Sequence, residues 1–91
     1  MSYNEEIRPL RSKIDALNRE ILGKIGERVR TSLEIGGVKR RHGRPVRDLA
    51  REAEVLNQVS RLAEDRGLDP EAVKRIFREI IDLCASAEEA S

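Results

Sequence analysis

Residues 7–28 read IRPLRSKIDALNREILGKIGER, and their apolar side chains recur at alternating steps of three and four residues. This spacing is typical of one face of an amphipathic α-helix. One heptad beyond Ile21, the same face carries Arg28 where an apolar residue is expected. A guanidinium is not buried without a partner, so Arg28 either meets a protein carboxylate or binds an anion from solution. The apolar members of the face are Ile7, Leu10, Ile14, Leu17 and Ile21.

Charged residues interrupt the apolar faces of two further periodic segments. In the second segment, the face that should be apolar begins with Asp48 and Glu52. In the third, the face that includes Cys84 next presents Glu88. A single change of this kind can mark the point where a helix face reaches solvent. Four such positions of mixed charge, with at least one in every segment, predict a polar pocket inside a helical bundle.

The first predicted helix is by far the longest element. We expect it to begin between Glu5 and Pro9, with acidic residues near its positive end, and to continue to Lys39 or Arg41. At ~1.5 Å per residue this makes a rod of roughly 50 Å, whereas a compact chain of this size has a radius of gyration near ~12 Å. The rest of the chain cannot cover such a rod. We therefore predict a homodimer in which two copies pack along their apolar faces.

An adjacent pair of glycines, Gly36 and Gly37, falls inside this predicted helix. Each glycine inside a helix costs up to about 1 kcal/mol relative to alanine, so the pair needs an explanation. Two explanations stay open: a kink at the pair, or the close approach of another helix to a small residue.

Two shorter helices are predicted after a loop. Gly67 is the stop residue of the second helix. Asp69 caps the third helix, with Pro70 at its first position. No strand-like alternation competes, so we predict an all-α single domain over residues 1–91. The expected bounds are a loop at 42–46, a second helix from Val46 or Asp48 to Arg66, and a third helix from Pro70 to about Ala87 or beyond.

The composition limits the classes of function. With 18 basic and 17 acidic residues the net charge is +1, so no overall field draws the chain to nucleic acid or to a membrane. The single Cys84 excludes an internal disulfide, and His42 has no second ligand at metal-binding spacing. There is no charged-then-apolar leader and no apolar run near the ~20 residues that span a bilayer, so we expect a cytoplasmic protein.

Short motifs follow one another in a fixed order along nearly the whole chain. They are LRSKIDALN at 10–18, Glu27-Arg28, GGVK at 36–39, GRPV at 43–46, Asp48, Arg51-Glu52, Val55-Leu56, GLDP at 67–70 and IFREII at 76–81. With this order and spacing, the chain resembles the all-helical chorismate mutases. The resemblance implies an intertwined homodimer with two active sites, whose long first helices cross both subunits. It also implies the Claisen rearrangement of chorismate to prephenate, on the route to phenylalanine and tyrosine, without a cofactor or metal.

The resemblance assigns the cations of the site. Arg28 would bind one substrate carboxylate and Arg11 of the partner subunit the other, while Lys39 would bridge a carboxylate and the ether oxygen of the breaking bond. The helical geometry is compatible with this. Arg28 and Lys39 are eleven residues apart, three turns and about 20°, so they share a face with roughly 16 Å between them. Arg11 is about 100° out of register on the same helix, so a crossing partner subunit would have to supply it.

The resemblance also assigns roles on the second and third helices. Glu52, with the backbone at Asp48, would hold the ring hydroxyl, and Arg51 would support the charges around it. Cys84 and Glu88 fall where the family often has a serine and a glutamine. The thiol is a weak donor, and a glutamate donates to an ether oxygen only when protonated. We therefore expect activity to fall as the pH rises and Glu88 loses its proton.

Three other functions remain as alternatives. The nearest is an isochorismate pyruvate lyase of the same fold, although the match around Asp48, Arg51 and Glu52 favours the mutase. The second is a weakly active dimer that regulates or docks onto another enzyme of the shikimate pathway. The third is nucleic-acid binding through the basic cluster at 39–47, which the balanced overall charge and the lack of stacking aromatic residues disfavour.

Overall fold

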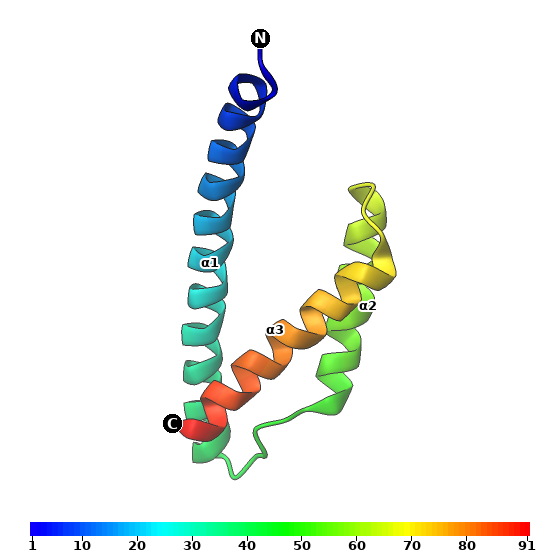
Figure 1. Cartoon of the computed structure of the whole chain (residues 1–91). Helices are drawn as coiled ribbons and strands as arrows, with labels where there is room; N and C mark the ends of the chain where they lie inside the picture. Colours follow the sequence, from blue (N-terminus) through cyan, green and yellow to red (C-terminus); the bar gives the residue numbers. More distant parts are fainter.

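The computed structural model describes residues 1–91 and contains three α-helices and no strand. They are α1, Tyr3–Arg41, α2, Leu49–Asp65, and α3, Pro70–Ala90. The predicted all-α fold with one long and two shorter helices is therefore confirmed. Helix α3 packs against both α1 and α2, and its carboxyl end lies beside the carboxyl end of α1 (Figure 1).

Local capping explains where each helix begins. Asp48 and Asp69 cap α2 and α3 through side-chain oxygens that accept backbone N–H groups, and Pro70 opens α3 as predicted. The predicted start of α1, between Glu5 and Pro9, is wrong by a few residues. The Ser2 hydroxyl caps the helix instead, so that α1 begins at Tyr3 and Pro9 lies within the helix rather than in its first turn.

Glycine ends the second helix where the sequence predicts it. Gly67 has a φ of +69°, which places it in the left-handed region that favours glycine. The N–H group of Leu68 then donates to the carbonyl oxygen of Ala63 at 2.9 Å, which closes the helix end. The loop before α2 runs from His42 to Asp48, two residues longer than predicted, because Asp48 is the cap and Leu49 the first helical residue.

Helix α1 continues without interruption through Gly36 and Gly37, so the kink expected as one alternative is absent. The other alternative is confirmed for Gly36. A Cβ atom placed on Gly36 would lie 3.3 Å from Cγ of Glu88, whereas one on Gly37 would meet only the ends of arginine side chains, at 3.8 and 3.9 Å. Gly36 is therefore the point where α3 comes close to α1.

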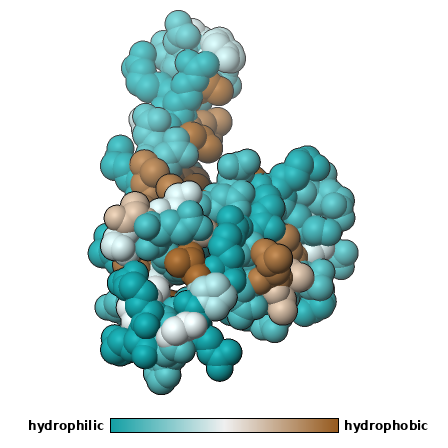
Figure 2. Space-filling view, turned by 90° about the horizontal axis from the view of Figure 1, so that it is seen from below, coloured by the Kyte–Doolittle hydropathy of each residue, from teal (hydrophilic) through white to brown (hydrophobic).

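The amino-terminal half of α1 has no partner within the chain. Leu10, Ile14, Leu17 and Ile21 remain 60, 55, 40 and 56% exposed, although they form the apolar face that the sequence predicts. The radius of gyration is 17.3 Å, well above the ~12 Å of a compact chain of this length. Hydrophobic side chains are open to solvent among the hydrophilic ones (Figure 2). None of the three helices has an apolar segment long enough to cross a bilayer.

Candidate active site

A pocket of about 450 Å³ lies between the carboxyl half of α1, the first turns of α2 and the last turns of α3. It contains every site residue that the sequence predicts except Arg11. The lining consists of Arg28, Thr31, Ser32, Ile35, Lys39, Val46, Asp48, Arg51, Glu52, Val55, Ile81, Cys84, Ala85 and Glu88.

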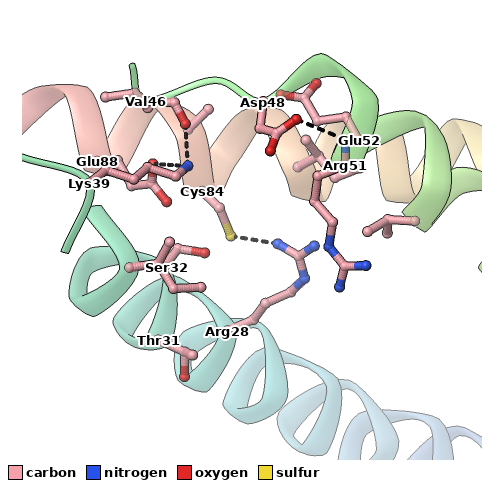
Figure 3. Close-up of a pocket in the computed structure, with 14 residues that line it drawn as sticks. Arg28, Thr31, Ser32, Lys39, Val46, Asp48, Arg51, Glu52, Cys84 and Glu88 are labelled. Atoms are coloured by element: carbon pink, nitrogen blue, oxygen red, sulfur yellow. Dashed lines mark hydrogen bonds and ion pairs between the residues drawn. The ribbon is translucent and has the colours of Figure 1, made fainter. Parts of the chain in front are cut away.

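Helical periodicity brings these residues together. On α1, the spacing of eleven residues places Arg28 and Lys39 on one face. Asp48 and Glu52 enter from the start of α2, and Cys84 comes from the end of α3 (Figure 3). The polar positions that interrupt the three apolar faces therefore meet in one place, and the predicted polar pocket is confirmed.

Arg28 has no carboxylate partner in the chain. Its Nη1 atom lies 3.0 Å from Sγ of Cys84, and no acidic side chain lies within ion-pair distance of its guanidinium. A thiol is a weak hydrogen-bond acceptor and does not balance the positive charge. Of the two alternatives for Arg28, pairing with an internal carboxylate is therefore excluded within this chain. The guanidinium is available to an anion in the pocket.

Lys39 joins the loop and α3 at the other end of the pocket. Its ammonium donates to the carbonyl oxygen of Val46 and lies 3.6 Å from Oε2 of Glu88 (Figure 3). The Glu88 side chain is only 7% exposed, whereas that of Lys39 is 23% exposed. One cation and one carboxyl group thus face the same end of the pocket.

Glu52 belongs to a charged network that the sequence did not reveal. Arg47 donates to both of its carboxylate oxygens, at 2.9 and 2.8 Å, and Arg78 donates to Oε1. Arg47 also reaches Asp82, at 2.8 Å. Led by the hydrogen bonds from Arg47, these contacts lower the pKa of Glu52 from 4.5 to about 2, although burial alone would raise it. Glu52 is therefore an anion at any physiological pH.

Asp48 and Arg51 are occupied by local contacts. The Asp48 carboxylate accepts the N–H group of Arg51 at 3.0 Å, which is its capping bond. The Arg51 guanidinium pairs with Glu54, and more than half of each side chain is exposed. Ser32 is a pocket residue that the sequence reasoning missed. It is buried and follows Arg28 by one helical turn, so the periodicity of α1 could have placed it on the same face. No local pattern pointed to Arg78 and Asp82 on α3.

Arg11 lies apart from this pocket. It is exposed on the amino-terminal part of α1, beside Ile7, Arg8 and Asp15. The seventeen residues that separate it from Arg28 correspond to roughly 25 Å along a helix. One chain alone therefore does not bring Arg11 to the site.

Comparison with known proteins relates the chain to a family of enzymes. Residues 10–89 match the family described as chorismate mutase type II. The chain is 37% identical over 87 residues to a bifunctional chorismate mutase/prephenate dehydratase of Aquifex aeolicus. This match covers 92% of this chain and 24% of that protein. It is 32% identical over 90 residues to the protein of the same description in Escherichia coli K12, with 99% of this chain and 23% of that protein covered.

A third relative is closer in length. The chain is 31% identical over 85 residues to a 4-amino-4-deoxychorismate mutase of Streptomyces venezuelae, and the match covers 92% of this chain and 82% of that protein. The chain spans about a quarter of the length of the two bifunctional relatives. The family match extends over all three helices and every residue of the pocket, and the chain therefore belongs to the type II chorismate mutase family.

Proposed function

We propose that the chain is a chorismate mutase, an isomerase that converts chorismate to prephenate in the biosynthesis of phenylalanine and tyrosine. The observation that carries this proposal is Arg28, a cation inside the pocket whose charge no carboxylate of the chain balances. Chorismate is a dianion, and a planar guanidinium binds a carboxylate through two parallel hydrogen bonds. The volume of about 450 Å³ lies within the range of small-molecule sites.

The reaction requires no nucleophile. In the rearrangement the ether C–O bond breaks as a new C–C bond forms within the same molecule, so the protein contributes by orientation and by electrostatic stabilisation. Arg28 would hold the substrate in its folded conformation. Lys39 would donate to the ether oxygen as negative charge develops there. Glu88, whose Oε2 atom lies 3.6 Å from the Lys39 ammonium, would donate to the same oxygen when it is protonated. Cys84 would contribute mainly by keeping Arg28 in place.

The active form would be an intertwined homodimer. The exposed apolar face of α1 supports this, since Leu10, Ile14, Leu17 and Ile21 remain 40 to 60% exposed in one chain. A second α1 packed on that face would cover these side chains. It would also bring Arg11 of the partner subunit to the pocket, where it would bind the second carboxylate of the substrate. Docking onto another enzyme of the pathway and a cytoplasmic location stay predictions from the sequence.

A second substrate has a specific argument in its favour. The relative of similar length is a 4-amino-4-deoxychorismate mutase, an enzyme that by its name acts on an analogue with an amino group at position 4. An isochorismate pyruvate lyase remains the third candidate. The test is to incubate the purified chain separately with chorismate, 4-amino-4-deoxychorismate and isochorismate and to identify each product. We expect prephenate from chorismate, and release of pyruvate from isochorismate without any mutase product would overturn the proposal.

A further inference from the structure

We propose that Arg47 is a positioning residue that, with Arg78, fixes Glu52 as a charge-balanced acceptor with one open position, and thereby selects a neutral hydroxyl group over an ammonium group on the substrate. The inference rests on the proposed function, since it concerns which substrate the same pocket takes. Glu52 lines the pocket, whereas neither arginine does. The two arginines would therefore act only through Glu52.

The contacts of Arg47 join three parts of the chain. Arg47 is in the loop before α2, and its guanidinium grips Glu52 on α2 through Nε and Nη2 at once. Its Nη2 atom also reaches Asp82 on α3 at 2.8 Å. Arg78, one turn before Asp82, contacts Glu52 from the α3 side and lies 3.5 Å from Asp82. Glu52 is thus held from two directions, and its carboxylate cannot change orientation without breaking these contacts.

The same contacts leave one acceptor position on Glu52. A carboxylate offers about four lone-pair positions, two on each oxygen. Oε1 accepts from Nη2 of both Arg47 and Arg78, whereas Oε2 accepts only from Nε of Arg47. The remaining position is on Oε2. Because Glu52 is ionised, it can only accept a hydrogen bond there, and a substrate group beside it must be a donor.

The charge of the network decides which donor is preferred. Arg47 and Arg78 contribute two positive charges, and Glu52 and Asp82 contribute two negative ones, so the network is neutral overall. A neutral hydroxyl donates to Oε2 without adding charge. An ammonium group would place a third cation beside the two guanidinium groups, whose charges Glu52 and Asp82 already balance. The other charged groups that line the pocket with Glu52 are Arg28, Lys39, Asp48, Arg51 and Glu88.

The enzymatic test compares Arg47→Gln with Arg47→Lys and with the control Arg44→Gln. Arg44 is an exposed residue of the same loop whose side chain makes no ion pair. For each variant, kcat and KM are measured on chorismate and on 4-amino-4-deoxychorismate at constant ionic strength. Circular dichroism is used to test whether each variant is folded.

Arg47→Gln leaves the network with one excess negative charge. We expect KM for chorismate to rise about tenfold, the scale of one hydrogen bond to a charged group, with a smaller change in kcat. The ratio of kcat/KM for the hydroxyl over the amino substrate should fall by a similar factor. Arg47→Lys keeps the positive charge but not the paired contact with Glu52. Relative to Arg47→Gln, it should therefore restore most of the preference for the hydroxyl substrate, but only part of the original KM for chorismate. Arg44→Gln should match the unaltered protein, and an unchanged ratio in folded Arg47→Gln would overturn the proposal.

A second measurement does not depend on turnover. In protein labelled with ¹³C at the glutamate carboxyl groups, the signal of Glu52 is identified by its absence in Glu52→Gln. We expect it to remain that of a carboxylate down to about pH 3 in the unaltered protein, and to take up a proton nearer pH 4.5 in Arg47→Gln. Uptake of a proton by the unaltered Glu52 between pH 4 and 6 would overturn the proposal that Arg47 and Arg78 hold it as an anion. Absence of turnover on both substrates, with this titration as expected, would instead refute the proposed function.

Discussion

The ammonium of Lys39 lies 3.6 Å from the carboxylate of Glu88, close to the point where α3 approaches α1 at Gly36. The close approach has a simple origin, since Gly36 is one turn before Lys39 and a side chain there would press on Glu88. A packing feature of the helix pair and a charged feature of the pocket thus depend on each other.

Replacing Lys39 by alanine should remove most of the activity and leave the fold intact. Removal of one donor aimed at a developing negative charge typically lowers kcat by ~100 to 1,000-fold. We would measure kcat from the steady-state consumption of chorismate and test folding by circular dichroism. Lys74→Ala on α3 is the control, because Lys74 pairs only with the exposed Glu71 and is outside the pocket. Near-normal kcat in Lys39→Ala would remove this lysine from the mechanism.

The two neighbouring glycines should respond differently to alanine. At Gly37 only movable arginine ends lie near, so Gly37→Ala should gain up to about 1 kcal/mol of helix stability. At Gly36 the new Cβ would meet Cγ of Glu88 at 3.3 Å, and α3 would have to shift away. We expect Gly36→Ala to gain less stability or to lose some, and to lower kcat/KM. Urea unfolding and enzyme kinetics on both variants test this, and identical behaviour of the two would contradict it.

Stability should depend on Glu52 in acid. Its pKa is about 2 in the folded chain and near 4.5 when unfolded, so its contribution is fully present above about pH 4.5 and is lost as the pH falls toward 2. Urea midpoints measured at intervals between pH 6 and 2 should decrease in this window for the unaltered protein, and less so for Glu52→Gln. Glu54→Gln, at an exposed position, serves as the control. Equal slopes for all three proteins would show that Glu52 is not the group concerned.

The contribution of Arg11 across the dimer can be tested by mixing inactive variants. We expect Arg11→Ala and Arg28→Ala each to lose activity, because each removes one carboxylate-binding cation from every site. In a mixed dimer, one site would receive both intact arginines and the other neither. After unfolding and refolding the two variants together, about a quarter of the original activity should return, since half of the dimers are mixed and each has one intact site. If nothing returns although mass spectrometry detects mixed dimers, Arg11 does not act in trans.

Much of the fold was predictable because its signals are local. Asp48 and Asp69 cap helices through atoms two or three residues away, and Gly67 ends a helix through its own backbone conformation. The predicted start of α1 is too late because the capping residue is Ser2, three residues before the first acidic residue of the helix, Glu5. Part of the pocket was predictable for the same reason, since helical periodicity singles out Arg28, Asp48, Glu52 and Glu88, whereas the family resemblance supplied Lys39, Arg51 and Cys84.

The partners of these residues required the tertiary structure. Arg28 meets Cys84 across 56 positions of sequence, and Arg47 meets Asp82 across 35. Periodicity indicates which face of a helix a residue occupies, and not which residue of another helix stands opposite. The sequence by itself thus determined three helices, most of their ends and a set of charged positions on their inner faces. Only the packing of α3 against α1 and α2 decided that Glu52 is clamped by two arginines while Arg28 is left without a carboxylate, because ion pairing depends on separations of a few ångströms between helices that no local pattern encodes.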